Sequence, residues 1–311
     1  MLRASFLYLS DQPQIFRFVR QNRLAKQFAS RFVAGETLDS ALAAVRVLNA
    51  AGISVSLDLL GESVHNEVEA REQQAQYLAL LDQIAREQLD ANVSLKLTAM
   101  GLDISEELCV SIMREILERA RAHRTFVRLD MEGSAYTERT LRLFEDRLFP
   151  NFREHVGIVL QSYLRRTPAD VDRANQLKCR VRLCKGAYQE PATVAFPDKA
   201  DVDRTYLHCM ERLVEHGNFP GIATHDERII AETKRFVAER GLSRDRFEFQ
   251  MLYGVRRDLQ AELVHDGYRL RVYVPFGTQW YPYLMRRLAE RPANVAFITG
   301  NVLRELLHSR G

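Results

Sequence analysis

The stretch ISVSLDLLG at residues 53–61 alternates polar and apolar side chains with a period of two. Ser54, Ser56 and Asp58 fall in one phase, and valine and leucine fill the other. Successive side chains of a β-strand point to opposite faces, so this alternation is typical of a strand with two different faces. The stretch therefore predicts a strand that separates an apolar layer from a polar space.

Seven further stretches of the same kind follow along the chain, separated by segments of helical period such as 106–123 and 201–217. They are NVSLKLTAMG (92–101), FVRLDMEGS (126–134), VGIVLQSYL (156–164), VRLCKGAY (181–188), PGIATHD (220–226), RFEFQMLYG (246–254) and RLRVYVPFG (269–277). Eight alternating strand–helix units without a linker-rich break predict an α/β fold, a (βα)8 TIM barrel in a single domain. A doubly wound sheet is disfavoured because no GxGxxG turn occurs.

The polar residues of these stretches also stay in phase, as expected if they line one common space. They are Ser94, Lys96, Thr98, Arg128, Asp130, Glu132, Gln161, Tyr163, Arg182, Cys184, Glu248 and Gln250. We expect the apolar phase to face the helices and the polar phase to line the barrel interior. One interpretation is a hydrogen-bonded network that only fills the barrel. The other, favoured because burying an unpaired ion costs several kcal/mol, is a ligand bound at the C-terminal mouth.

The ends of the chain extend this barrel. Residues 1–52 have apolar residues three and four apart and a helix stop at Gly52, which predicts a helical segment packed on the barrel formed by residues 53–311. After the last strand, QWYPYLMRRLAERPANV predicts a C-terminal helix that carries Arg286 and Arg287. Two such arginines can grip one small carboxylate, and the alternative is ordinary solvated charge on a helix.

The composition limits the classes of function. The 44 basic and 41 acidic residues give a net charge of +3, too even a balance for a nucleic-acid-binding protein. Four cysteines without CxxC spacing are expected to be reduced thiols, which is typical of the cytoplasm. The N-terminal stretch lacks the apolar core of a secretory signal, and no run of about 18 apolar residues occurs. We expect a cytoplasmic protein, which can still attach to a membrane surface through one apolar stripe.

Candidate binding residues gather in CRVRLCKGAYQEP (179–191), a charged stretch that otherwise resembles a buried strand. Arg182 and Lys185 can hold a phosphate or stabilise an electron-rich ring, and Gly186 lets the backbone approach a ligand closely. The alternative is surface charge at a strand end. Lys96 is also compatible with a Schiff-base lysine of an aldolase-like barrel.

Histidine spacing argues against a metal site. The eight histidines show no HxH or HExxH spacing, so we predict no metal. His225, at a strand end in GIATHDERII, is expected to act as a hydrogen-bonding partner.

The chain resembles the proline dehydrogenase family in four stretches taken together: RLCKGAY, ATHD, EFQMLYGV and RVYVPFGTQWYPYLMRRLAERPAN. The family includes short monofunctional bacterial enzymes and the matching domain of bifunctional proline-utilisation flavoproteins. Four further stretches occur in the order found in the family: SLDLLGE, VSLKLTA, VRLDME and VLQSYLRRTPAD. The resemblance therefore extends over about residues 53–300. It implies a distorted barrel that holds non-covalent FAD.

The resemblance also implies an activity and its partners. The enzyme would oxidise L-proline to Δ1-pyrroline-5-carboxylate and pass the electrons to a membrane quinone, from a peripheral position on the inner face of the cytoplasmic membrane. Hydride would leave the ring carbon next to nitrogen. Because no aldehyde dehydrogenase domain follows in this sequence, a separate pyrroline-5-carboxylate dehydrogenase would take the product, and nucleic acid is not an expected partner.

Residue roles follow from the resemblance position by position. Lys96, Arg286 and Arg287 would bind the proline carboxylate, with Glu62 as a gate that pairs with one arginine. Asp130 and Arg182 are the catalytic candidates. Tyr273 and Leu252 would line the substrate pocket beside Asp130. The residues implied around the cofactor are Met131, Gln161, Arg182, Lys185, Gly186, Ala187, Tyr188, Thr224 and His225.

Alternative functions use the same barrel. Another flavin-dependent barrel oxidoreductase, such as a methylenetetrahydrofolate reductase, would be reduced by NADH. A Schiff-base aldolase would use Lys96 without a flavin. A non-enzymatic binding barrel would carry no chromophore at all.

Overall fold

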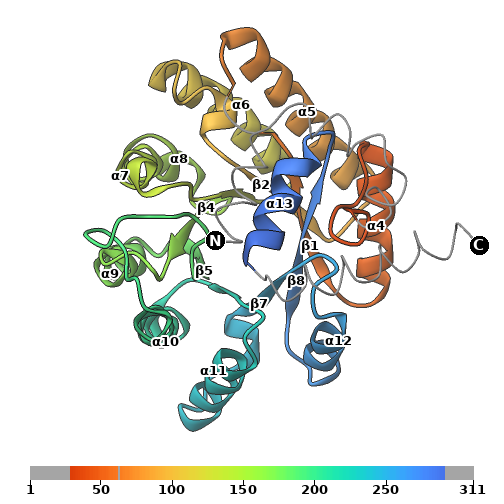
Figure 1. The fold of residues 1–311 in the computed structure, drawn as a ribbon. Helices are drawn as coiled ribbons and strands as arrows, with labels where there is room; N and C mark the ends of the chain where they lie inside the picture. Colours follow the sequence, from red (N-terminus) through yellow and green to blue (C-terminus); the bar gives the residue numbers. More distant parts are fainter. Residues whose placement is uncertain (1–28, 62–63, 291–311) are drawn as a thin grey trace, which may run out of the picture.

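The computed structural model describes residues 29–61 and 64–290. In this part of the chain eight parallel strands pair in chain order, and the last pairs back onto the first, so the sheet closes into a barrel (Figure 1). The strands are β1 (Ser54–Leu59), β2 (Ala91–Leu95), β3 (Val127–Leu129), β4 (Val156–Gln161), β5 (Arg180–Cys184), β6 (Gly221–Ala223), β7 (Glu248–Leu252) and β8 (Leu270–Phe276). The (βα)8 barrel predicted from the sequence is confirmed.

Helices connect successive strands and cover the outside of the barrel (Figure 1). They are α4 (Leu38–Ala50), α5 (Glu67–Arg86), α6 (Glu106–Ala122), α7 (Ser134–Leu143), α8 (Phe149–Phe152), α9 (Thr167–Leu177), α10 (Lys199–His216), α11 (Glu227–Glu239), α12 (Arg257–His265) and α13 (Trp280–Glu290), with short turns η1 (Thr98–Met100), η2 (Phe144–Leu148) and η3 (Arg244–Arg246). Side-chain caps fix several helix starts, because Asn66 accepts a hydrogen bond at the start of α5 and Ser105 at the start of α6. The apolar strand phase, such as Val55 and Leu57, is fully buried beneath the helices.

The polar phase of the strands lines the interior of the barrel, as expected. The Arg182 side chain on β5 donates hydrogen bonds to partners from four other strands or strand ends: Ser56 Oγ (3.3 Å), Ser94 Oγ (3.0 Å), Asp130 Oδ1 (2.7 Å) and Gln250 Oε1. Only a side chain inside the barrel can reach so many strands. The hydrogen-bonded network considered as one interpretation is therefore present, and around Arg182 the interior charges satisfy one another. The argument for a ligand from unpaired ions is correspondingly weaker there.

Two glycines make room for this network. A Cβ at Gly157 on β4 would collide with the Arg180 carbonyl oxygen and would lie 2.8 Å from Nη1 of Arg128. A Cβ at Gly221 on β6 would collide with the amide nitrogen of Gln250. Small residues on β4 and β6 thus compensate for long ones on neighbouring strands.

The chain before β1 lies across the C-terminal end of the barrel beside α13. The backbone N–H of Ala34 donates to the carbonyl oxygen of Pro275 at 2.9 Å, and the Trp280 indole donates to Glu36 at 2.9 Å. Figure 1 shows α13 in front of the barrel opening. A small core joins the two segments: Ala29, Val33, Leu60, Trp280, Tyr281, Tyr283, Leu284 and Met285. The predicted segment 1–52 is described only from residue 29 onward.

Among the helices of the described residues, none combines the length and apolar character needed to cross a membrane. The same residues contain no group of three or more His, Cys, Asp or Glu side chains placed to hold a metal ion.

The space at Gly157 gives a test of the interior packing. Gly157→Ala should lower the free energy of unfolding by about 1–3 kcal/mol, because the new methyl group meets fixed backbone and cannot be accommodated by a rotamer change. Chemical denaturation measures the change. An unaltered unfolding midpoint would contradict the tight approach of β4 and β5.

Candidate active site

A hollow of about 810 Å³ opens at the C-terminal ends of the strands. Its walls combine strand ends, the loops that follow them, and residues from the N-terminal segment and α13, including Arg31, Phe32, Tyr283 and Leu284. Enzymes with this fold carry out their chemistry at this end of the barrel, because the loops after the strands converge there. The position of the hollow therefore makes it the candidate active site.

An ion pair between Arg182 and Asp130 forms its floor. Nη1 of Arg182 lies 2.7 Å from Oδ1 of Asp130, with only 8% and 12% of the two side chains exposed. The Tyr273 hydroxyl donates to Oδ2 of Asp130 at 2.9 Å, and the guanidinium carbon of Arg182 lies 5.2 Å from the centre of the Tyr273 ring. The three side chains hold one another in place, so each keeps one orientation toward the hollow.

A second pair lies beside the first. Nζ of Lys96 lies 3.7 Å from Oδ2 of Asp58, with 11% and 2% of the side chains exposed. Burial, followed by the negative charges of Asp130 and Asp58, raises the pKa of Tyr273 well above its usual value. The tyrosine therefore keeps its proton and acts as a hydrogen-bond donor between two carboxylates.

Lys185 occupies the edge of the hollow within a cluster of alternating charges. Its Nζ lies 2.6 Å from Asp203 and 2.8 Å from Asp226, and Lys199 contacts the same two carboxylates. Although burial alone would raise the pKa of Asp226, hydrogen bonding to Lys185 and the lysine charge hold it below its ordinary value. Both acids are thus ionised at neutral pH and fix the Lys185 ammonium group in place.

The loop after β5 is held at both ends. Gly186 has a φ of +109°, and a Cβ there would collide with the ring of Tyr163, so only glycine fits this close approach. Glu190 accepts hydrogen bonds from the backbone N–H of Ser134, at 2.6 Å, and from its hydroxyl, at the first residue of α7. Negative charge is favoured at a helix N-terminus. The loop residues Ala187 and Tyr188 are thereby held against the hollow.

Two further groups indicate what kind of ligand fits. Oε1 of Gln161 is buried and has no hydrogen-bond donor among the described residues, which costs about 1–3 kcal/mol unless a ligand supplies one. Nε2 of His225 accepts the backbone N–H of Leu252 at 2.9 Å, so this histidine carries its proton on Nδ1. A ligand with N–H or O–H donors would satisfy Gln161.

The structure brings most of the predicted site residues to this one hollow: Lys96, Asp130, Met131, Gln161, Arg182, Lys185, Gly186, Ala187, Tyr188, Thr224, His225, Leu252 and Tyr273. Glu62 lies outside the described residues, as do the side chains of Arg286 and Arg287, whose backbone belongs to α13. Their predicted roles stay predictions.

Several lining residues were not predicted as part of the site. Asp58 and Gln250 were recognised only as members of the polar phase, and Asp226 follows His225 directly, so sequence signals for them existed. Arg31 and Phe32 carry no such signal, because their position depends on how the N-terminal segment crosses the barrel.

Fold and site together define a (βα)8-barrel protein with a charged binding pocket at its catalytic end. The family model for proline dehydrogenase matches residues 41–300. This chain belongs to the proline dehydrogenase family, whose members are oxidoreductases of proline catabolism.

The relatives agree with this assignment. The chain is 43% identical over 307 residues to "Proline dehydrogenase 1" of Bacillus subtilis (strain 168), covering 98% of this chain and 100% of the relative. It is 42% identical to "Proline dehydrogenase" of Deinococcus radiodurans over 98% of both chains. Proline utilization A from Bdellovibrio bacteriovorus, solved after inactivation by N-propargylglycine, superposes with a TM-score of 0.81 at 28% identity, over 89% of this chain and 34% of that one.

The ion pair at the floor of the site makes a stability prediction. Arg182→Met should lower the free energy of unfolding by about 3–5 kcal/mol, because it leaves the mostly buried Asp130 without its cation. Adding Asp130→Asn should restore part of the loss. Denaturant unfolding without added ligand measures both.

The matched control is Arg204→Met. Arg204 pairs with Asp201 on the surface with 76% of its side chain exposed, so its removal should cost less than about 1 kcal/mol. If Arg182→Met cost no more than Arg204→Met, the buried pair would not hold the barrel together.

Proposed function

We propose that this protein is an FAD-dependent L-proline dehydrogenase that forms Δ1-pyrroline-5-carboxylate and passes electrons to a membrane quinone. The observation that supports it most directly is the convergence of Lys96, Arg182 and Asp130 in one pocket of a chain that belongs to the proline dehydrogenase family. The reaction removes two electrons and two protons from the substrate. A separate pyrroline-5-carboxylate dehydrogenase would then oxidise the product.

The cofactor assignment is supported by the chemistry of the pocket. A flavin ring offers an N–H donor, which suits the buried acceptor Gln161 Oε1. Gly186 lets the loop after β5 approach a flat ring closely, and the fixed ammonium of Lys185 suits an anionic group. The residues proposed to hold FAD non-covalently are Met131, Gln161, Arg182, Lys185, Gly186, Ala187, Tyr188, Thr224 and His225. When bound, FAD supplies the two-electron acceptor.

The substrate end of the pocket is assigned to the pair of Lys96 and Asp58. Lys96 would bind the proline carboxylate, joined by Arg286 and Arg287 of α13, and Glu62 would gate this position. Asp58 lies 3.7 Å from Nζ of Lys96 and would hold the lysine side chain in direction, since both side chains are almost fully buried. Fixing the carboxylate at one end orients the ring carbon beside the amine, and such positioning contributes several kcal/mol to catalysis.

Tyr273, Leu252 and Asp130 would contact the proline ring. Tyr273 stays protonated, because burial and two nearby carboxylates raise the pKa of its hydroxyl. The hydroxyl is also fixed in direction by its bond to Asp130 at 2.9 Å. Arg182 is held at the floor of the pocket by its ion pair with Asp130, so that its guanidinium group would have a fixed orientation toward electron-rich species there.

A visible absorption spectrum with an anaerobic titration tests the proposal. The purified protein should show oxidised-flavin bands, and L-proline should bleach them while NADH does not. Bleaching by NADH alone would favour a methylenetetrahydrofolate reductase-like enzyme. A protein that stays colourless after incubation with FAD would overturn the proposal and return Lys96 to Schiff-base chemistry.

The role of Lys96 has its own test. Lys96→Met should raise the KM for L-proline at least tenfold while the flavin spectrum is unchanged, because a charge-assisted hydrogen bond to a carboxylate is worth roughly 1.5–3 kcal/mol. Steady-state kinetics with an artificial electron acceptor measures it. Lys234→Gln is the control, since Lys234 pairs with Asp266 and is not part of the pocket lining. An unchanged KM in Lys96→Met would remove Lys96 from the carboxylate site.

A further inference from the structure

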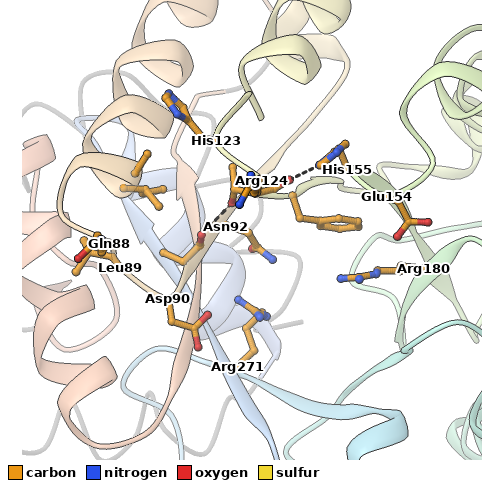
Figure 2. A pocket seen from close by; sticks show the side chains of 15 residues that line it. Gln88, Leu89, Asp90, Asn92, His123, Arg124, Glu154, His155, Arg180 and Arg271 are labelled. Atoms are coloured by element: carbon orange, nitrogen blue, oxygen red, sulfur yellow. Dashed lines mark hydrogen bonds between the residues drawn. The ribbon is translucent and has the colours of Figure 1, made fainter. Parts of the chain in front are cut away.

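A second hollow opens at the opposite, N-terminal end of the barrel. It has a volume of about 670 Å³ and lies between the starts of β2, β5 and β8 and the loops that precede β2, β3 and β4 (Figure 2). The charged and histidine side chains around it are Asp90, His123, Arg124, Glu154, His155, Arg180 and Arg271. None of these residues takes part in the proposed oxidation.

Arg180 is one of the cations that line this hollow. Its guanidinium carbon lies 5.2 Å from the ring centre of Phe126 and 5.5 Å from that of Phe219, so two aromatic rings hold it in place. Its Nε is buried without a hydrogen-bond acceptor among the described residues, and none of their carboxylates forms an ion pair with it. Arg180 is thus a fixed guanidinium that lacks an anion.

The charge around Arg180 is unbalanced. Arg271 pairs with the buried Glu248 at 2.8 Å, whereas Arg128 donates only to the backbone carbonyls of Ile158 and Arg180. Three guanidinium groups therefore share one buried carboxylate. Burial and the repulsion of neighbouring arginines lower the pKa of Arg128 to about 9, although Glu248 opposes this.

The acidic residues on the rim do not correct the imbalance. Asp90 and Glu154 are exposed, and within residues 29–61 and 64–290 neither forms an ion pair. Asp90 instead accepts a hydrogen bond from Ser54 at 2.6 Å. Exposed carboxylates are strongly screened by water, so they do little for buried arginines.

The backbone is strained at Phe219, whose ring contacts Arg180. Phe219 has a φ of +46°, a left-handed conformation that is unfavourable for a bulky residue. In this position its ring contacts both Arg180 and Arg269. Strain of this kind is often found where a binding group must be held in one orientation.

We propose that the N-terminal hollow is a binding site for a small oxyanion, with Arg180 as its principal ligand and Arg271 as a second positive group. A guanidinium presents paired N–H donors that match the geometry of phosphate and carboxylate oxygens. The bound anion supplies the missing negative charge beside Arg128 and Arg180. The site stabilises the base of the barrel and is separate from the mouth where proline oxidation is proposed, so it does not rest on that function.

The test uses the full-length protein as purified, with inorganic phosphate, malonate and chloride at matched ionic strength. Phosphate or malonate should raise the thermal unfolding midpoint in proportion to the logarithm of its concentration above the dissociation constant, by about 5 °C at a hundredfold excess, and chloride should not. Titration calorimetry should give one site per chain. A stronger response to phosphate identifies a tetrahedral anion as the ligand class, and a stronger response to malonate identifies a carboxylate.

Arg180→Met should abolish the rise of the unfolding midpoint, and Arg180→Lys, which keeps the charge, should raise the dissociation constant of the anion at least tenfold in the calorimetric titration. Arg269→Gln is the matched control, because Arg269 also contacts Phe219 but pairs with Asp245 and does not line the hollow. Its response should equal that of the parent protein. An equal rise with all three anions, or a rise and a calorimetric binding curve retained unchanged in both Arg180 variants, would overturn the proposal. Proline oxidation by the same samples reports separately on the catalytic mouth.

Discussion

The position of Arg182 in the closed barrel is the constraint on which most of the site depends. Its guanidinium joins Ser56, Ser94, Asp130 and Gln250, which come from strands or strand ends spread around the barrel. A shift of β1, β2, β3, β5 or β7 along its neighbour would leave at least one of these groups buried without its partner, at a cost of about 1–3 kcal/mol. The network therefore fixes strand register and site geometry together.

The long polar side chains inside the barrel require small residues at other positions of the barrel wall. Strands β4 and β6 place Gly157 and Gly221 inside the barrel next to Arg128 and Gln250. The interior is accordingly filled by long polar side chains from some strands and by backbone from others. A wholly apolar interior would pack equally densely, but it would provide no directed charge at the mouth.

Much of this was accessible from the sequence. The period-two alternation around Ser56 and Asp58 predicts both the strand and the face that points inward, and its repetition predicts the barrel. The pairing of Arg182 with Asp130 could not be predicted from alternation, because it depends on which strands face each other across the interior. Arg31 was missed for a similar reason, since its position follows from the path of the N-terminal segment over β7 and β8.

The two ends of the barrel differ in how their cations are balanced. At the catalytic mouth Lys96, Arg182 and Lys185 each lie beside an aspartate. The aspartates fix the orientation of these cations and balance their charge. A substrate carboxylate would then need additional positive charge, and Arg31 is a further cation in the lining of the pocket. At the base Arg128 and Arg180 have no carboxylate of their own among the described residues. The same polar strand phase thus produces a balanced field at one end and a cationic one at the other, and the proposed anion site lies at the cationic end.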